Sequence, residues 1–334
     1  TKHLLFMTVL VTGGAGYIGS HAVKNLKNLG YEVVAIDNLV CGHKEILEDI
    51  LKVPLVIGEI GDEELIKNLL KGEFNIQKNS KSVKLPPISA VMHFAAFTCV
   101  GESLSNPAKY YKNNVCDSLN LINCIVKENS RRASIKGGIL NEIPIVFSST
   151  CATYGIPKDI PINEDTTQEP INPYGRSKLI VESFLKDFGE AYNLKSIIFR
   201  YFNVAGADPK TDIGEWHIPE THLIPLIFDS ILGKREKLEI YGTDYPTKDG
   251  TCIRDYIHVE DLVSAHILGM NNLLENISKN IEQDHNTEIF NLGNGEGFSV
   301  KEIVSTVEKI TTKKVPVKFS KRRKGDPYAL IASS

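Results

Sequence analysis

The fold of this chain is decided near its start, by the stretch Val9-Leu10-Val11-Thr12-Gly13-Gly14-Ala15-Gly16-Tyr17-Ile18-Gly19-Ser20-His21. The apolar run at residues 7–11 predicts a buried strand, and the apolar spacing at residues 20–29 predicts a helix. Glycines at positions 13, 16 and 19 let backbone N–H groups in the turn approach a phosphate, and the helix N-terminus adds about half a positive charge. The stretch therefore predicts a strand, a phosphate-binding turn and a helix in succession.

A carboxylate follows the second predicted strand. The apolar run at residues 31–36 ends at Asp37, 18 residues after Gly19. A carboxylate in this place accepts hydrogen bonds from both ribose hydroxyls of NAD, whereas it would repel the 2′-phosphate of NADP. Asp37 therefore favours NAD as the cofactor. The alternative is that Asp37 only caps the loop that follows the strand.

Strands and helices alternate along the first two-thirds of the chain. Further strands are predicted at residues 55–57, 90–94, 145–147 and 196–199, with helical patterns between them. This alternation predicts an α/β fold, a Rossmann-type doubly wound parallel sheet with helices on both faces. After Asn203, frequent prolines and glycines predict a smaller α/β substrate lobe towards the C-terminus, with the ligand held between the two lobes.

These patterns set the expected domain boundaries. The cofactor-binding domain is expected at residues 7–203, with 255–295 returning to it, and the substrate lobe at 204–254 and 296–334. Three polar stretches without periodicity, at residues 72–87, 128–141 and 275–288, are expected to be surface insertions with no chemistry.

The composition favours a protein that acts on a small molecule. Of the 334 residues 42% are apolar, enough for two hydrophobic lobes. Lys and Arg number 38 against 41 Asp and Glu, so the formal charge of -3 predicts neither nucleic acid nor a membrane as a partner. Six cysteines without C-x-x-C spacing predict free thiols in a reducing cytoplasm. The histidines are scattered, and His217 and His222 lack the helical i, i+4 spacing, so no metal site is expected.

Two catalytic candidates lie four residues apart in Tyr174-Gly175-Arg176-Ser177-Lys178. On a helix, Tyr174 and Lys178 share one face. A tyrosine acts as a base at neutral pH only if its pKa of about 10 falls by about three units, and the Lys178 ammonium and a positive nicotinamide ring would favour the phenolate. A hydroxyl is expected beside them, because Ser148, Ser149 and Thr150 follow a predicted strand whose end meets the ligand in such sheets.

With these residues, the chain resembles the extended short-chain dehydrogenase/reductase superfamily and, within it, the family of UDP-glucose 4-epimerases. The resemblance covers nearly the whole chain and rests on six segments in order. Besides the stretch quoted first, they are His93-Phe94-Ala95-Ala96, Val100-Gly101-Glu102-Ser103, Pro173-Tyr174-Gly175-Arg176-Ser177-Lys178, Arg200-Tyr201-Phe202-Asn203 and Arg254-Asp255-Tyr256-Ile257-His258-Val259. The resemblance implies tightly bound NAD and reversible exchange of UDP-galactose and UDP-glucose through a 4-keto sugar.

The resemblance also implies a role for each matching position. Catalysis is expected of Thr150, Tyr174 and Lys178: Tyr174 takes the proton of the C4 hydroxyl through or beside Thr150, while the C4 hydride passes to NAD. The expected NAD contacts are Gly13, Gly16, Tyr17, Ile18, Gly19, Asp37, Asn38, Glu59, Ile60, Phe94, Ala95, Asn113, Ser148, Tyr174, Lys178 and Tyr201. The expected contacts of the UDP part are Asn203, His222, Leu223, Tyr241, Arg254, Arg323 and Asp326.

The C-terminal part bears on which sugar is accepted. Residues 322–330 resemble the closing sugar-nucleotide segment of the family, and Leu330 stands where a tyrosine restricts the pocket to plain hexoses. Leucine leaves acceptance of N-acetylated sugars open. The sequence stops at Ser334, where relatives run on for a few dozen residues, so the UDP-sugar-binding lobe is expected to be truncated. A homodimer is a further expectation from the resemblance.

Other activities would use the same residues. A 4-epimerase of UDP-xylose and UDP-arabinose, or of UDP-N-acetylhexosamines, stays as an alternative. A catalytically silent NAD-binding scaffold is an alternative from another class, but it has no need of Thr150, Tyr174 and Lys178 together. A 4,6-dehydratase is disfavoured, because it needs acids directly after the catalytic threonine, where Cys151 and Ala152 stand.

Overall fold

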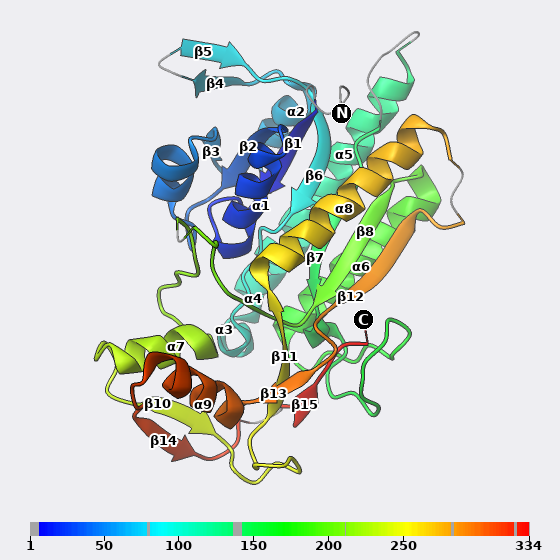
Figure 1. The fold of residues 1–334 in the computed structure, drawn as a ribbon. Helices are drawn as coiled ribbons and strands as arrows, with labels where there is room; N and C mark the ends of the chain where they lie inside the picture. Colours follow the sequence, from blue (N-terminus) through cyan, green and yellow to red (C-terminus); the bar gives the residue numbers. More distant parts are fainter. Residues whose placement is uncertain are drawn as a thin grey trace.

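A computed structural model describes residues 7–78, 81–135, 142–210, 212–281, 284–323 and 326–333. The chain forms a seven-stranded sheet between helices, in the upper part of Figure 1, and a smaller lobe below it. Lys324 and Gly325 of the closing segment, Ser334 and parts of all three polar stretches lie outside the described residues. Among the residues described, no helix is both long and apolar enough to cross a membrane.

The large sheet is parallel throughout, in the strand order β12-β8-β7-β6-β1-β2-β3. Its strands are β1 (Thr8–Thr12), β2 (Glu32–Asp37), β3 (Leu55–Ile57), β6 (Ile88–His93), β7 (Ile145–Thr150), β8 (Ser196–Tyr201) and β12 (Thr287–Leu292). This confirms the Rossmann-type doubly wound sheet. Each strand predicted from the sequence begins and ends within three residues of the observed strand. Strand β12 was not predicted.

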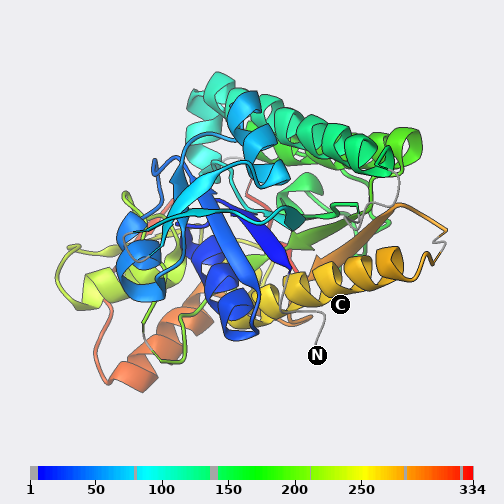
Figure 2. The same ribbon diagram turned by 90° about the horizontal axis from the view of Figure 1, so that it is seen from above.

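Helices cover both faces of the sheet, as Figure 2 shows from above. On one face lie α1 (Tyr17–Asn28) and α8 (Val259–Ser278), and on the other α2 (Glu63–Lys71), α5 (Ser118–Ala133) and α6 (Pro173–Tyr192). Side chains alternate across β1, so Val9 and Val11 belong to the core under α1 and α8, and Leu10 belongs to the opposite core. Burial on both faces explains the continuous apolar runs that predict these strands.

The start of α6 is set by local hydrogen bonding. The Asn172 side chain accepts a hydrogen bond from the Gly175 N–H at 2.8 Å, and Pro173 occupies the first helical position. Both features are typical of helix N-termini, because they satisfy or remove N–H groups that have no partner inside the helix. Two short helices, α3 (Val100–Ser105) and α4 (Pro107–Tyr110), pack against α6. Tyr174 is therefore held in the first turn of a long, well-capped helix.

The smaller lobe has its own hydrophobic core. Helices α7 (Leu223–Ile231) and α9 (Val300–Thr311) pack on a parallel pair formed by β10 (Leu238–Tyr241) and β14 (Val317–Ser320). Between this core and the large sheet, β11 (Ile253–His258) pairs with β9 (Asn203–Ala205), β13 (Gly297–Ser299) and β15 (Ala329–Leu330). The domain boundaries given above stay a prediction.

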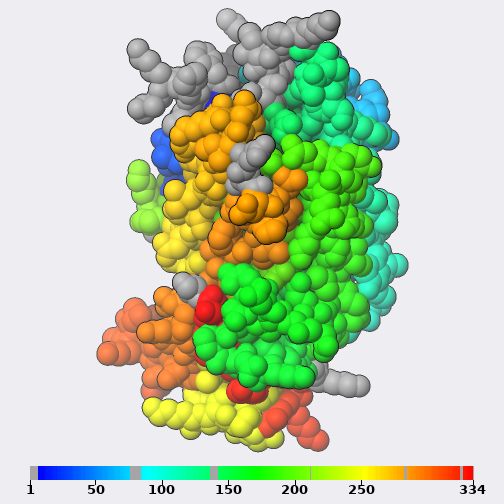
Figure 3. All heavy atoms as spheres, turned by 90° about the vertical axis from the view of Figure 1, so that its right-hand side faces the viewer, coloured from blue at the N-terminus to red at the C-terminus, as the bar shows by residue number. Residues whose placement is uncertain are grey.

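The last described residues lie in the seam between the two parts, where Figure 3 shows them in red between green and orange surfaces. Ile162 donates its N–H to the carbonyl of Ile331 at 2.8 Å and accepts from the N–H of Ser333 at 2.7 Å. The Ala332 N–H donates to the buried Asp255 carboxylate at 3.1 Å. The segment thus ties a loop of the large part to β11 of the smaller lobe.

All three polar stretches have structure that their composition does not indicate. Residues 275–288 include the last residues of α8 and the first two of β12. Residues 72–87 contain an antiparallel hairpin of β4 (Asn75–Lys78) and β5 (Lys81–Lys84). Glu128 and Arg132, four residues apart, belong to α5 and form a buried ion pair at 2.8 Å. The expectation of a plain surface insertion is therefore wrong for the start of the 128–141 stretch. The polar composition suggested a surface loop, but Glu128 and Arg132 are buried in α5 because their charges neutralise each other.

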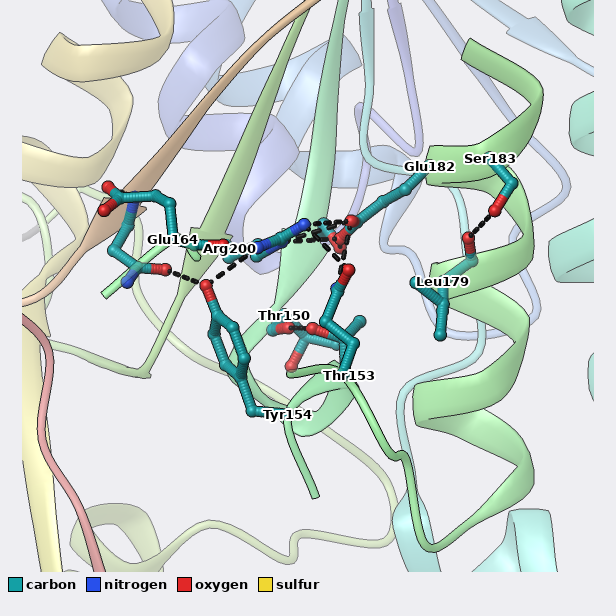
Figure 4. A network of polar contacts seen from close by, with 11 residues as sticks. Thr150, Thr153, Tyr154, Glu164, Leu179, Glu182, Ser183 and Arg200 are labelled. Carbon is teal, nitrogen blue, oxygen red and sulfur yellow. Dashed lines mark hydrogen bonds and ion pairs between the residues drawn. The ribbon is translucent and has the colours of Figure 1, made fainter. Parts of the chain in front are cut away.

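A network of buried polar groups holds the carboxyl ends of β7 and β8 against α6 (Figure 4). The Arg200 guanidinium and the Glu182 carboxylate pair at 2.7 Å, with side chains 2% and 0% exposed. Ser149 donates its hydroxyl to Glu182, and Arg200 donates to the Tyr154 hydroxyl at 2.9 Å. Tyr154 in turn donates to the Asn291 side chain of β12 at 2.7 Å. The network links three strands and the helix directly beside Thr150.

Replacing Arg200 by Met would leave the Glu182 carboxylate buried without its cation. Because breaking a buried pair leaves an uncompensated charge, we expect the free energy of unfolding to fall by about 3–5 kcal/mol. Urea unfolding followed by circular dichroism measures the change. The control is Arg235→Met at an exposed arginine, where a change within about 0.5 kcal/mol is expected. Equal losses in the two variants would contradict the role assigned to the pair.

Candidate active site

The glycine turn between β1 and α1 has no room for side chains at its critical points. Gly13 has a φ of +69°, and a Cβ there would lie 2.7 Å from the backbone nitrogen of Ala95. A Cβ on Gly19 would lie 2.1 Å from the Gly13 carbonyl oxygen. No side chain within the described residues caps the N-terminus of α1, and its first turn carries no acid. The turn therefore presents backbone N–H groups and a positive dipole, as a bound pyrophosphate requires.

Asp37 ends β2 beside this turn, with its carboxylate buried. One oxygen accepts the Ala15 N–H at 3.0 Å, and the other accepts the Leu39 N–H at 2.8 Å. Burial raises the pKa of Asp37, and the two N–H groups oppose that rise. Asp37 therefore does cap the loop, as the alternative interpretation expects. A carboxylate can accept about four hydrogen bonds, so Asp37 can still accept hydrogen bonds from ribose hydroxyls.

The other residues expected to contact NAD follow neighbouring strands. Phe94 and Ala95 come directly after β6 and lie against Gly13. Ile60 is buried and Glu59 exposed, both just after β3. Asn113 is half-buried in a π-helical segment, Tyr111–Asp117, that precedes α5. The carboxyl ends of parallel strands meet at one edge, so β1, β2, β3 and β6 deliver their following residues to the same side of the sheet.

The three expected catalytic residues meet at the end of β7. Thr150 is the last residue of this strand, and its hydroxyl contacts the Tyr174 phenol closely enough to lower the pKa of that phenol. Lys178 donates from Nζ to the carbonyl oxygen of Ser148 at 2.7 Å. Tyr174 and Lys178 are 7% and 3% exposed. The hydroxyl, the phenol and the amine that the sequence pattern indicates are therefore brought together on one strand end and one helix.

The pKa of Tyr174 differs from the expectation. Burial raises it well above its usual range, the neighbouring Tyr201 raises it further, and the Thr150 hydroxyl lowers it. The Lys178 amine lies against the Ser148 carbonyl, and burial lowers its own pKa to about 7. With a pKa of about 7, the buried amine carries less positive charge at neutral pH than the fixed ammonium that the residue spacing suggests.

A histidine absent from the sequence analysis completes this region. His266, in the middle of α8, shares a hydrogen bond with the Ser148 hydroxyl at 3.0 Å. Its ring centroid lies 5.0 Å from that of Phe94 and 6.3 Å from that of Tyr201. Burial lowers the pKa of His266 to about 4, so the ring is neutral at pH 7. No sequence signal marks it, because 118 residues separate it from Ser148.

The residues expected to bind UDP fall into separate groups in the smaller lobe. Arg254 forms an ion pair with Asp326 and donates to the Pro327 carbonyl at 3.0 Å. Leu330 pairs with Arg254 across β15 and β11. The Arg323 guanidinium lies 4.0 Å from the centre of the Tyr241 ring, a cation–π contact. The fold thus brings Arg254 into contact with Asp326, 72 positions later, and Tyr241 into contact with Arg323, 82 positions later.

The three remaining expected residues lie at the starts of a strand and a helix. Asn203 begins β9 and lies opposite Tyr256 of β11. His222 and Leu223 mark the N-terminus of α7, and the His222 ring forms an ion pair with Glu215. His217 lies in the same group of side chains. The sequence spacing of His217 and His222 did not predict that they would lie close together. The spacing rule fails here because these histidines lie on a loop whose path brings them together.

The chain is similar to known proteins in both sequence and fold. A sequence model described as NAD dependent epimerase/dehydratase family matches residues 9–293. The chain is 42% identical over 327 residues to a UDP-glucose 4-epimerase of Rhizobium leguminosarum bv. trifolii, covering 98% of this chain and 89% of that protein. Among solved structures, UDP-glucose 4-epimerase from Brucella ovis in complex with NAD aligns with a TM-score of 0.83 at 42% identity, covering 98% of this chain and 90% of that one.

A second solved structure contains both kinds of ligand. UDP-glucose 4-epimerase from Bifidobacterium longum in complex with NAD+ and UDP aligns with a TM-score of 0.80 at 33% identity, covering 98% of this chain and 90% of that one. The family match extends from the second residue of β1 to the residue after β12, and so includes all seven strands of the large sheet except Thr8. On the sequence match, the full-length identity and the shared fold, this chain belongs to the NAD dependent epimerase/dehydratase family.

Proposed function

We propose that this chain interconverts UDP-galactose and UDP-glucose at C4 with NAD bound. The observation that carries the proposal is the meeting of Thr150, Tyr174 and Lys178 at the carboxyl edge of the sheet that also carries the dinucleotide turn. Full-length relatives at 42–43% identity are UDP-glucose 4-epimerases, which supports this sugar pair over UDP-xylose and UDP-arabinose.

The residues of the carboxyl edge fit NAD. Gly13, Gly16 and Gly19 would face the pyrophosphate. A side chain on Gly13 would collide with the backbone of Phe94 and Ala95, and one on Gly19 would collide with the turn itself. Asp37 and Asn38 would hold the adenosine ribose, and Phe94 and the other expected contacts named above would line the path to the nicotinamide. The chemistry that NAD supplies when bound is removal and return of a hydride at C4 of the sugar.

Tyr174 is proposed as the group that takes and returns the proton of the C4 hydroxyl. Thr150 offers the phenol a hydrogen-bonding partner, and the two side chains come from elements locked by the Arg200–Glu182 pair. A proton leaves the C4 hydroxyl as the hydride leaves C4, which gives a 4-keto sugar. When the keto group presents its other face, return of hydride and proton inverts C4.

The diphosphate of UDP is proposed to bind at the arginines of the smaller lobe. Arg254 is largely buried and forms an ion pair with Asp326. Its guanidinium has five N–H groups, so other donors stay available to a phosphate. Arg323 is exposed above the Tyr241 ring. Charge-assisted bonds of this kind suit a phosphate. Asn203, His222 and Leu223 are proposed to complete the site.

Three expectations stay predictions beside this proposal. They are a cytoplasmic location, a homodimer, and a truncated UDP-sugar-binding lobe; the Leu330 position leaves acceptance of N-acetylated sugars open. The described thiols are all free, and burial raises the pKa of Cys151 to about 12, so this thiol takes no part in the proposed chemistry.

The proposed activity is tested with the purified chain, UDP-galactose and no added NAD. Formation of UDP-glucose, followed by chromatographic separation of the two sugars, is expected because the bound cofactor is regenerated in each cycle. UDP-xylose and UDP-N-acetylglucosamine are assayed in parallel. Turnover of either of these with none of UDP-galactose would overturn the sugar assignment, and NAD-loaded protein that turns over no UDP-sugar would support a silent scaffold.

Tyr174→Phe removes only the phenolic oxygen. Because general acid–base catalysis contributes about 10²–10⁴-fold, we expect turnover to fall by that factor while calorimetry shows unchanged binding of UDP. Tyr192→Phe is the matched control, since Tyr192 is exposed at the other end of the same helix and should keep full activity. Near-normal turnover in Tyr174→Phe would exclude this tyrosine as the base.

Lys178→Met removes a buried amine whose ionisation is linked to folding. Burial lowers the pKa of Lys178 to about 7 in the folded chain, whereas an unfolded lysine has a pKa of about 10.4. Between these values the unfolded state binds more protons, so this group makes the free energy of unfolding rise with pH. The cost of burying the ammonium is full below about pH 7 and is relieved as the pH rises above it.

We therefore expect the stability of the unaltered chain, relative to Lys178→Met, to increase from about pH 6.5 to about pH 9. Urea unfolding at several pH values measures it. Lys186→Met, at an exposed lysine of the same helix, should follow the unaltered chain at every pH. Parallel stability curves for Lys178→Met and the unaltered chain would show that the buried amine does not titrate in this window.

A further inference from the structure

Four metal-ligating side chains converge outside the catalytic centre. They are Glu215, His217, Glu220 and His222, on the loop that leads into α7. Each offers one ligand atom, and these four atoms all lie within 4.8 Å of one another. Two imidazoles and two carboxylates thus face a common point, although the residues alternate with others along an irregular stretch of chain.

The separations match those of a small coordination sphere. His217 Nδ1 lies 3.4 Å from a Glu215 carboxylate oxygen and 3.7 Å from one of Glu220, and His222 Nδ1 lies 4.0 Å from Glu220. Zinc binds nitrogen and oxygen ligands at about 2.0–2.1 Å in a tetrahedron, which places ligand atoms about 3.3 Å apart. These three separations are slightly longer than that spacing, and the His222–Glu215 contact is shorter than it.

The charges of the group also call for a cation. Two carboxylates approach the same imidazole nitrogen, and Glu215 is largely shielded, with its side chain 7% exposed. The His217 Nδ1 atom is buried and, among the described residues, has ion-pair contacts but no well-directed hydrogen bond. Like charges held this close are unfavourable unless a positive charge lies between them. Either a proton on His217 or a metal ion supplies it, and only a metal ion engages all four groups.

The loop that carries these groups spans the two parts of the molecule. The Tyr17 ring of the dinucleotide turn stands edge-on to the His217 ring at 6.3 Å, and the Tyr17 hydroxyl donates to the Gly206 carbonyl at 2.5 Å. The Trp216 ring stacks on the His43 ring at 3.9 Å, beyond β2. The loop then enters α7 of the smaller lobe at His222. A tie at this point fixes the loop against the cofactor turn.

We propose that Glu215, His217, Glu220 and His222 form a structural zinc site. The proposal does not require the epimerase activity, although His222 is shared with the proposed UDP site. Imidazole and carboxylate ligands suit Zn²⁺, and four protein ligands close its tetrahedral coordination, as in structural rather than catalytic sites. Coordination through Nδ1 also fixes the His222 ring and leaves Nε2 as its other polar atom. The site holds the loop from Glu215 to His222 in one conformation between the dinucleotide turn and α7.

The test uses the full chain with its NAD, first stripped with a chelator and then equilibrated with ZnSO₄. After dialysis against metal-free buffer, elemental analysis should find one zinc per chain, and the zinc-loaded chain should melt at a higher temperature than the stripped one. Replacement by Co²⁺ should give the visible absorption of a tetrahedral nitrogen–oxygen site. No retained zinc, or a cobalt spectrum of the hydrated ion, would overturn the proposal and leave a proton on His217 as the neutralising charge.

His217→Gln and Glu220→Gln remove one ligand each with little change of size, and we expect zinc affinity by calorimetry to fall at least about tenfold in both. His285→Gln, at an exposed histidine far along the chain, and Glu236→Gln, at an exposed glutamate, are the matched controls and should bind zinc like the unaltered chain. Circular dichroism and NAD content verify that the variants are folded. Equal zinc affinity in His217→Gln and His285→Gln would place the bound zinc elsewhere and refute the site.

Discussion

The buried charge of Glu182 is the constraint on which the catalytic side of this molecule depends. A carboxylate removed from water is tolerated only where a cation and hydrogen-bond donors replace its hydration, and here Arg200 of β8 and Ser149 of β7 do so. Because Glu182 belongs to α6, the helix can occupy only the position in which all three groups meet. The helix and the ends of two strands are therefore fixed by one buried ion pair.

This constraint explains how a rigid site forms from separate elements. Tyr174, Lys178 and Glu182 are spaced four residues apart, so they form one stripe along α6, and all three meet β7 near its end. The stripe begins at a well-capped helix terminus, which keeps Tyr174 in its place. A fixed approach of helix to strand suits acid–base chemistry, because proton transfer requires atoms within hydrogen-bond reach.

Burial of the side chains in this region also shifts their pKa values. It lowers the pKa of Lys178 to about 7 and that of His266 to about 4, and it raises the pKa of Tyr174. Each shift disfavours the charged form, as expected where water is excluded. In the chain alone, the Thr150 hydroxyl is the group that opposes the rise for Tyr174. A phenolate at Tyr174 therefore needs further positive charge, such as that of a bound ligand.

The amino-acid sequence by itself determined the Rossmann-type sheet, the glycine turn, Asp37 and the Tyr174–Lys178 pair, because these are local patterns. Apolar runs report burial on both faces of a strand, and glycines report a backbone with no room for a Cβ. Only the tertiary structure decided the placement of β12, the partnership of Arg200 with Glu182 and the grouping of His217 with His222. The physical reason is that strand pairing, burial and charge compensation depend on contacts between residues distant in sequence or on the path of an irregular loop, and neither leaves a periodic signal in the chain.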